Sequence, residues 1–355
     1  MKILFPDYYK KFTCIADKCP DTCCAGWDIV IDGESLEKYA SLDGDFGKKT
    51  RSLITVDEEG DSIFVSDNGR CPFLLKSGLC EMYCEIGHGN LCRTCRNFPR
   101  FTNAFGARRE TGISLSCPEA ARLIFESKTP VAFETEDTDE PIIPSDFDAE
   151  LYFTLIDARK KAFYIIQNRN FPIGRRMCAF LRFSEDTQKL INSGEYEKIS
   201  SLMPDDYFGE NTEFSPSKAK RALKKYFSVF TSMEFINSSY SDLLSAAETV
   251  DMQGFEPDDA DYENLAVYFI FRYFITAAYD GNLIDKSRLA AVSLIAVSRL
   301  QAASGKDIVQ TAQKFSKEVE HSANNMDILM KSVKKSGFYS TKNLINILSE
   351  RENDI

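Results

Sequence analysis

Cysteine is distributed very unevenly along this chain of 355 residues, and no other feature constrains the fold as much. Ten of the eleven cysteines lie before residue 118, and only Cys178 lies beyond it. Four of the ten share the stretch CIADKCPDTCCAGW (14–27) with the only tryptophan. Thiols at such spacing form disulfides, ligate a metal or cluster, or stay buried and reduced. The first third of the chain must therefore fold around them through short turns.

The sequence divides into two parts of different character. The first part is rich in turn-forming stretches such as DGDFGKK, SDNGR and GHGN, with short β-like runs between them. The stretch ETEDTDEPIIPSDFD (134–148) is typical of a linker or surface loop, and the hydrophobic spacing after it is helical. We therefore predict an α+β fold that is predominantly α. Its parts are an irregular cysteine-rich metal-binding region at 1–130, a linker or surface loop at 131–149 and an α-helical domain at 150–355.

Several helices of the second part can be placed from their sequence. Ser215 and Pro216 mark a helix start, because serine caps the first turn and proline fits the first helical position. Further helices are predicted at 260–280, 285–304, 306–320 and 340–351. The apolar run at 265–279 carries Arg272 and is shorter than the about 20 residues that a membrane span requires, so it predicts a buried core helix.

The N-terminal sequence and the charge limit the compartment and the partners. MKILFPDYYKKF becomes polar too early for a secretory signal. We therefore expect a cytoplasmic protein with no membrane partner, in which grouped cysteines serve metal or redox chemistry more often than disulfides. The formal net charge of −11 argues against a nucleic-acid partner, which requires a large positive surface.

The spacing of the cysteines leaves the kind of metal site open. Four thiolates suit a zinc site, and four thiolates also hold an iron–sulfur cluster. The adjacent pair Cys23–Cys24 suits one zinc poorly, because neighbouring side chains diverge. A standard radical S-adenosylmethionine motif, C-x3-C-x2-C, is not formed, since Gly26 stands where a third cysteine would follow Cys19 and Cys23.

The segment 87–109 contains five arginines and no acidic residue. Such arginines can offset the charge of a thiolate-rich centre or bind a carboxylate or phosphate, and the alternative is a solvated loop that pairs with acids elsewhere. His88 lies in this segment and is a secondary candidate for contact with metal or substrate. His321 is predicted to be a surface residue near a helix end. Trp27 is expected to shield the metal site or contact a ligand, and Cys178 to lie in the core.

Four segments, in this order, carry a resemblance to a known family. They are CPDTCCAGW (19–27), CPFL with GLC (71–80), LCRTCRNFPR (91–100) and LSCPEAARL (115–123). Together they resemble the flagellin lysine N-methylase family of bacteria and, less closely, the cysteine-cluster domain described as zinc- or iron-chelating. The helical remainder is compatible in length and kind but offers no comparable signature.

The resemblance implies transfer of methyl groups from S-adenosylmethionine to lysines of flagellin, with a cysteine-bound iron–sulfur cluster of the 4Fe-4S type. Four thiolates would hold one cluster, and the family's cysteines carry over to Cys14, Cys19, Cys23, Cys24, Cys71, Cys80, Cys95 and Cys117. Cys84 and Cys92 stand where the family need not have cysteine. The alternative is a non-enzymatic zinc- or iron-binding module fused to a helical protein-interaction domain.

A lysine methylase must also bind and deprotonate its substrate, because the reference pKa of lysine is about 10.4. The sequence singles out no residue for this task. Candidates for the base near the motifs are Glu119, Glu110, Asp21 and Tyr83. Candidates for holding the cofactor are Arg93, Arg96, Arg100 and Trp27.

Overall fold

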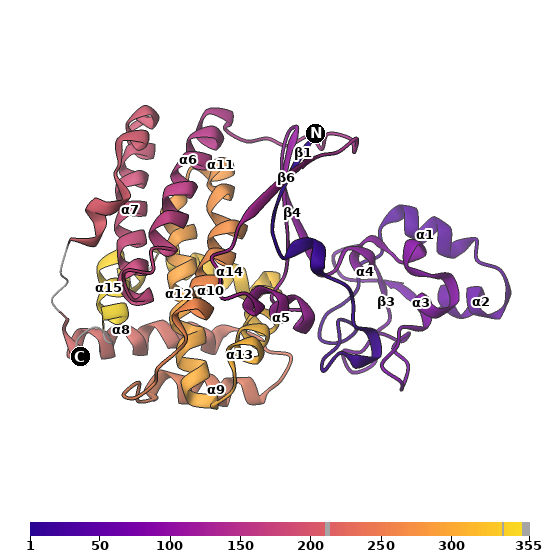
Figure 1. Ribbon diagram of the computed structural model, residues 1–355. Coiled ribbons are helices and arrows are strands. Elements are labelled where there is room, and N and C mark those ends of the chain that lie inside the picture. The colour runs from indigo at the N-terminus through magenta and orange to yellow at the C-terminus, as the bar shows by residue number, and fades with distance from the viewer. Residues whose placement is uncertain (210–213, 336, 350–355) are drawn as a thin grey trace.

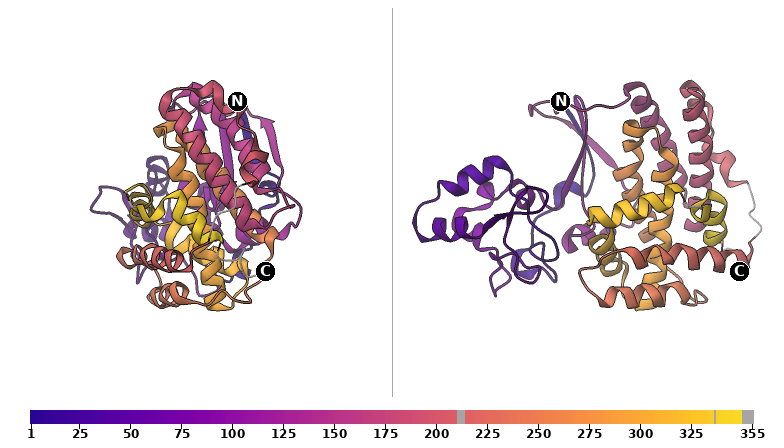
Figure 2. Two further views of the ribbon diagram at one scale, coloured as in Figure 1. Left: turned by 90° about the vertical axis from the view of Figure 1, so that its left-hand side faces the viewer. Right: turned by 180° about the vertical axis from the view of Figure 1, so that it is seen from behind.

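The computed structural model describes residues 1–209, 214–335 and 337–349. Figure 1 shows a small lobe that contains α1–α4, a larger body of helices, and a β-sheet between them, and the view from behind in Figure 2 agrees. We call residues 14–98 the cysteine lobe, and the region from α5 to α15 the helical body. The chain is predominantly α, as predicted.

The sheet between the two parts has the strand order β4-β5-β1-β6. Its strands are β1 (Lys2–Pro6), β4 (Arg100–Phe105), β5 (Arg108–Ile113) and β6 (Phe133–Asp137). β1 runs parallel to β5 and antiparallel to β6, and β4 and β5 form a hairpin. β6 lies inside the stretch predicted to be a linker, so that prediction is wrong for residues 133–137. The acidic residues that suggested a loop belong to an exposed edge strand, where charges are common.

The cysteine lobe consists of short elements joined by turns. They are η2 (Ala16–Lys18), α1 (Gly33–Ala40), α2 (Gly44–Ser52), β2 (Ile54–Val56), β3 (Ser62–Phe64), α3 (Glu81–Ile86), η3 (His88–Asn90) and α4 (Arg93–Asn97), and η1 (Tyr9–Lys11) precedes the lobe. A small core of its own includes Tyr39, Phe64 and Phe73. The sheet and the first helix of the body pack into a different core, so packing separates residues 29–92 from the rest. The domain boundaries at 130 and 149 stay a prediction.

The helical body follows the predicted spacing closely. Its α-helices are α5 (Pro118–Glu126), α6 (Ala149–Ile166), α7 (Ile173–Ser193), α8 (Pro216–Ser228), α9 (Ser239–Thr249), α10 (Asp259–Tyr273), α11 (Ala277–Asp280), α12 (Leu283–Ser304), α13 (Ile308–Phe315), α14 (Ala323–Lys335) and α15 (Thr341–Leu348). Short 3-10 turns connect them: η4 (Tyr196–Ser201), η5 (Pro204–Phe208), η6 (Phe230–Ser232), η7 (Phe274–Thr276) and η9 (Gly337–Tyr339). The last two positions of the predicted helix 340–351 lie outside the described residues.

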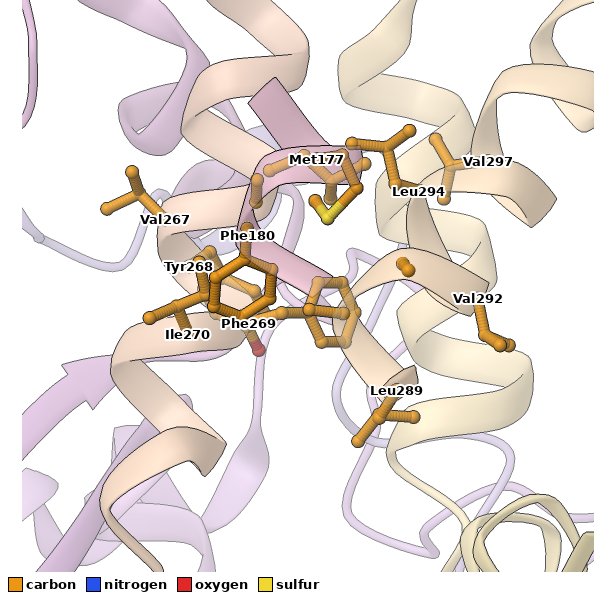
Figure 3. Packing of buried hydrophobic residues seen from close by; sticks show 14 of the residues in the cluster. Met177, Phe180, Val267, Tyr268, Phe269, Ile270, Leu289, Val292, Leu294 and Val297 are labelled. Carbon is orange, nitrogen blue, oxygen red and sulfur yellow. The ribbon is translucent and has the colours of Figure 1, made fainter. Parts of the chain in front are cut away.

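The core of the helical body forms where α7, α10 and α12 meet (Figure 3). Met177 and Phe180 of α7 are fully buried there. The apolar run at 265–279 is a buried core helix followed by η7 and α11, as predicted. Among the described residues, no helix combines the length and apolar character needed to cross a membrane. Cys178 lies in this core, also as predicted.

The predicted helix at 306–320 is interrupted. α13 ends at Phe315, and Ser316–Glu320 form one turn of π-helix, which we call the π-turn. All five of its residues are buried, although three of them are charged. Because a π-turn changes the direction of side chains within a helix, such turns occur often at functional sites.

Candidate functional site between the cysteine lobe and the helical body

Hydrogen bonds of the backbone fix the segments of the cysteine lobe that carry the thiols. The Cys71 N–H donates to the carbonyl of Cys24 at 2.8 Å, which joins the segments 19–27 and 71–80. The Arg93 N–H donates to the carboxylate of Asp32 at 2.7 Å and so fixes the start of α4. Cys92 is the residue that precedes this helix. These ties bring thiols from distant parts of the sequence to one place.

Six thiols lie close enough to interact with one another. Cys24 interacts with Cys23 and Cys80, and Cys95 interacts with Cys92 and Cys24. We call the six together the thiol group: Cys23, Cys24, Cys71, Cys80, Cys92 and Cys95. Five of them are among the eight predicted metal ligands. Cys92, which stands where the family that the sequence resembles need not have cysteine, also lies inside the group.

Crowding and burial change the acidity of these thiols. Interaction with Cys23, to which burial adds, raises the pKa of Cys24 to about 12, and burial raises the pKa of Cys71 to about 11. Cys92 is the exception, because a hydrogen bond with Cys95 lowers its pKa to about 7 and raises that of its partner. Metal ligands are thiolates, so metal binding would displace the protons that packing holds here.

The other predicted ligands lie outside the thiol group. Cys14, Cys19 and Cys117 form a second cluster at the start of α5, where burial raises the pKa of Cys117 to about 11 and the other two thiols add to the effect. Cys84 is exposed on α3. His88 is also exposed, on η3.

The donor chemistry of the thiol group fits either an iron–sulfur cluster or zinc, since both take four thiolates. Within the described parts of the chain, no three Cys, His, Asp or Glu side chains are arranged to hold one metal ion. The fold therefore gathers the donors without closing them into a coordination shell. The metal-binding character of this region remains a proposal.

A buried ion pair joins the segment just before Cys23 to the π-turn. Lys317 donates to the Asp21 carboxylate at 2.7 Å and to the carbonyl of Thr22 at 3.1 Å. Gln313 of α13 also donates to Asp21, at 3.1 Å. Burial acts to raise the pKa of Asp21, but the hydrogen bond and charge of Lys317 outweigh it and lower that pKa overall. The π-turn thus holds the loop that carries two of the thiols.

Aromatic contacts of Trp27, which follows Cys23 and Cys24 in sequence, extend the junction between the cysteine lobe and the helical body. The ring of Trp27 meets the imidazole of His321 edge-on, with centroids 4.1 Å apart. Phe98 packs against both rings, at 5.8 and 5.7 Å. The ammonium group of Lys317 lies 5.3 Å from the Trp27 ring. His321 is half-buried by these contacts, so the prediction of a surface residue is wrong. It does directly follow the end of a helical turn.

A carboxylate network supports the other side of the π-turn. Glu320 accepts hydrogen bonds from the hydroxyls of Tyr268 (3.0 Å) and Tyr273 (2.8 Å) and pairs with Arg272 at 3.1 Å. Ser316 donates to the same carboxylate at 2.5 Å. The network explains how Arg272, at the centre of an apolar run, is accommodated in the core.

Two cavities lie at the junction, and the Asp21–Lys317 pair stands between them. The larger, of about 520 Å³, is lined by Asp21, Arg122 and Tyr240 together with residues of α12 and α13. The smaller, of about 390 Å³, is lined by Lys317 and by Gly26, Trp27, Glu234, Phe235, Ile236, Glu318, His321, Ser322 and Ala323. Both cavities therefore have walls from the cysteine lobe and from the helical body.

The four candidates for the base fall in different places. Asp21 and Glu119 line the larger cavity. Glu110 is buried on β5 and accepts two hydrogen bonds from Arg159, at 2.5 and 2.7 Å, so its carboxylate is already occupied. Tyr83 is exposed on α3. Neither Glu110 nor Tyr83 is among the residues that line the two cavities.

The arginine segment does not gather at one ligand. The Arg96 guanidinium donates to the carbonyl of Gly89 at 3.2 Å, and Arg100 lies over the ring of Phe12 at 5.2 Å. None of Arg93, Arg96 and Arg100 lines either cavity. Arg109 pairs with Glu140, which agrees with the alternative that the arginines of this segment form ion pairs with acidic residues elsewhere in the chain. Of the four cofactor candidates, Trp27 alone lines a cavity.

Sequence reasoning missed the contribution of the segment KEVEHS (317–322). Its signal was present, because two glutamates and a histidine fall in a stretch whose spacing predicts a half-buried helix. The direction of these side chains could not be predicted, since a π-turn has no sequence signature of the kind that caps or turns have. Only the fold shows that Glu318 and His321 face the cysteine lobe.

Comparison with protein-family models bears on the helical body. The family described as FliB lysine N-methylase C-terminal domain matches residues 159–347. The chain belongs to this FliB lysine N-methylase family. The resemblance drawn from the cysteine segments is thus confirmed by a part of the chain in which sequence reading found no signature. No solved structure matches.

Curated relatives of the FliB family come from Salmonella. A lysine-N-methylase of Salmonella typhimurium is 26% identical over 211 residues, which are 56% of this chain and 52% of that protein. A lysine-N-methylase of Salmonella choleraesuis is 26% identical over 217 residues, with the same coverage. A flagellar biosynthetic protein FliU of Salmonella muenchen is 29% identical over 133 residues, 36% of this chain and 79% of that protein. The match thus spans about half the length of the two lysine-N-methylases.

Proposed function

We propose that this protein is a protein-lysine N-methyltransferase that acts on flagellin, using S-adenosylmethionine and an iron–sulfur cluster held by cysteine. The names of the Salmonella relatives support the methyl transfer and the flagellar substrate. The observation that carries the proposal is the junction itself. There the matched helical body supplies the π-turn that holds the loop bearing Cys23 and Cys24.

The thiol group is the place for the cluster. It offers six thiols where four are needed, and they come from three segments, of which 19–27 and 71–80 are joined by a backbone hydrogen bond and 91–100 is fixed by the Asp32 carboxylate. We assign the second cluster of Cys14, Cys19 and Cys117 no part in ligation, because three thiols fall short of four. A bound 4Fe-4S cluster would supply redox-active or Lewis-acidic iron beside the junction.

The larger cavity fits S-adenosylmethionine. Its apolar walls, among them Leu243, Leu300 and Val309, suit an adenosine, and charged side chains of both signs suit the amino-acid end. Arg122, which pairs with Glu119 and Glu126, would exchange those partners for the carboxylate. Asp21 would share its charge between Lys317 and the ammonium group. The hydroxyl of Tyr240 is buried at this cavity and has no hydrogen-bond partner among the described residues, so it is available to a ligand.

Metal analysis and a transfer assay test the proposal together. Protein purified without oxygen should be brown and contain about four iron and four sulfide atoms per chain. It should transfer labelled methyl groups from S-adenosylmethionine to flagellin of its own source organism under reducing conditions. Zinc alone in the protein would overturn the cluster, and no transfer by the iron-loaded protein would overturn the activity.

A conservative variant tests the cofactor cavity. Tyr240→Phe should weaken S-adenosylmethionine binding about five-fold, because one hydrogen bond is worth about 1 kcal/mol. Ser293→Ala is the matched control, since its hydroxyl is also buried without a hydrogen-bond partner among the described residues but lies on α12 outside both cavities. Equal affinities of the two variants, measured by calorimetry, would place the cofactor elsewhere.

A second function rests on a specific observation. The cysteine lobe has its own core, as a metal-stabilised module fused to a helical interaction domain would have. That reading predicts stoichiometric zinc, no visible absorbance, and unfolding of the cysteine lobe alone when a chelator is added.

A further inference from the structure

The smaller cavity has the shape and lining for an aliphatic chain. Trp27, Phe235 and Ile236 give it apolar walls, and its volume of about 390 Å³ exceeds that of one long side chain. Gly26 makes the wall possible: it has a φ of +102°, and a Cβ there would stand 2.6 Å from Cδ1 of Ile236. The chain therefore approaches the helical body here more closely than another residue would allow.

Of the charged side chains that line this cavity, one carboxylate lacks an ion-pair partner among the described residues. Lys317 is neutralised by Asp21. Glu318 is fully buried, accepts from the Ile236 N–H at 2.7 Å and pairs with Lys314 at 2.9 Å. Glu234 has no ion pair with any residue that the structure describes, and its side chain is exposed at the cavity. The surplus negative charge favours a cationic ligand and disfavours an anion.

His321 is the remaining polar group. Its ring forms no hydrogen bond with a described residue, although it lines the cavity. Burial lowers the pKa of His321, and the positive charges of Arg272 and Lys317 lower it further. Glu320 acts in the opposite direction without reversing the shift. The charged groups that face His321 are therefore Arg272, Lys317 and Glu320, together with Glu234 and Glu318 of the cavity.

We propose that the smaller cavity binds the side chain of the lysine to be methylated, with Glu234 attracting its ammonium group and His321 accepting its proton. This rests on the proposed function and goes beyond it by naming the acceptor site. In the step assigned to His321, one N–H bond of the ammonium breaks and one forms on a ring nitrogen. The lysine becomes a neutral amine with a free electron pair, and the imidazole becomes an imidazolium.

The position of the cavity agrees with this role. Gly26 and Trp27 lie two and three residues after Cys24 in sequence, so the loop that carries a member of the thiol group also lines this cavity. The Asp21–Lys317 pair separates it from the larger cavity, which we assign to the methyl donor. The methyl donor and the lysine that accepts the methyl group would thus bind on two sides of the Asp21–Lys317 ion pair.

Histidine NMR tests binding without any turnover. The chain has two histidines, so His88→Gln leaves His321 as the single imidazole signal. Adding Nα-acetyl-lysine N-methylamide to the labelled full-length protein should shift that signal and lower the pKa of His321, because a cation is brought near it. The norleucine analogue, which lacks the ammonium group, should do neither. An unchanged His321 signal at saturating lysine analogue would overturn the site.

Kinetics test the proton transfer. His321→Gln should lower methyl transfer at neutral pH about 100-fold, as for loss of a general base, and the loss should shrink as pH rises and the lysine deprotonates by itself. His88→Gln is the matched control and should keep the wild-type rate. Glu234→Gln should raise KM for a flagellin peptide several-fold and keep kcat. A His321→Gln enzyme with the wild-type rate and pH profile would overturn the assignment.

Two further measurements keep the outcomes distinct. Iron content and S-adenosylmethionine affinity of His321→Gln should equal those of the wild type, and a loss of either would overturn a role limited to the acceptor. If the wild-type protein transfers no methyl group at all, the proposed function fails. The NMR experiment still decides whether the cavity binds an alkylammonium.

Discussion

The cysteine lobe and the helical body are stabilised in different ways. The core of the lobe consists of eight buried residues, and hydrogen-bonded turns position the thiols around it. The core of the body draws on most of its helices, with α7, α10 and α12 at the centre (Figure 3). Small cores give little net stability, so a small domain often needs a metal or another cross-link. The comparison therefore leads us to expect that the stability of the lobe depends on its thiols and that the stability of the body does not.

The largest expected effect comes from removing three thiols at the centre of the group. Replacing Cys24, Cys80 and Cys95 with serine should reduce bound iron and sulfide to less than about a tenth of wild type and abolish methyl transfer, because the three thiols that remain in the group fall short of the four that a cluster needs. Far-UV circular dichroism should show the helices intact. Cys84→Ser is the control, since this cysteine is exposed and outside the group. A full cluster in the triple variant would show that the ligands lie elsewhere.

The reverse experiment weakens the body and leaves the thiols in place. Phe180→Ala should lower the free energy of unfolding by about 3–5 kcal/mol, because the ring is fully buried between helices. Phe153→Ala, on the exposed face of α6, should change it by less than about 0.5 kcal/mol. Urea denaturation measures both. The folded Phe180 variant should retain its metal, and loss of the metal would mean that the two parts are not independent.

The link between the two parts is tested at Lys317. Lys317→Met should lower the free energy of unfolding by about 1–3 kcal/mol, because it leaves the half-buried Asp21 without its cation. The pKa of Asp21 is lowered in the folded state, so its contribution is present above its unfolded value of about 3.9 and lost as pH falls through the folded value. The difference between variant and wild type should therefore shrink below about pH 4.

Lys331→Met is the control for this link, since Lys331 pairs with Asp327 on the exposed face of α14. It should have almost no effect at any pH. A difference between Lys317→Met and wild type that stays constant down to pH 3 would show that lost packing, rather than the charge of Asp21, carries the effect.

The smallest expected effect lies in the sheet. Glu136→Gln removes the ion pair of β6 with Lys10, in which both side chains are about half exposed. The free energy of unfolding should fall by less than about 1 kcal/mol and the change should disappear in 1 M salt, where exposed charges are screened. A larger loss that persists in 1 M salt would mean that Glu136 stabilises the sheet by packing rather than by its charge.

The helices of the body could be predicted because their pattern is local. Ser215 directly precedes α8 and Pro216 is its first residue, as predicted. The strand at 133–137 could not, because its pairing partner lies at the other end of a long sequence separation. Long-range contacts also decided which cysteines lie together. The spacing along the chain did not reveal that Cys92 lies close to Cys24 and that Cys14 lies outside the thiol group.

The site was predictable only in part, for a related reason. Asp21 and Trp27 could be named because they adjoin the cysteines in sequence. His321 and Glu318 could not, because their approach depends on a π-turn and on the packing of two parts. Glu110 was misleading, since a carboxylate beside a motif serves equally well as the partner of a buried arginine.

The sheet topology gives the cysteine lobe the character of an insertion. Pro6 ends β1 and Arg100 begins β4, and both lie at the same end of the sheet, with only β5 between the two strands. Neighbouring strands are about 4.8 Å apart, so these two points are separated by about 10 Å. Everything between them is a detour that leaves and re-enters one framework. The cysteine lobe of residues 14–98 could be excised and its ends bridged by a few glycines, and the remaining scaffold should still fold, because Tyr8 and Phe12, which pack into the core of the helical body, would stay in place.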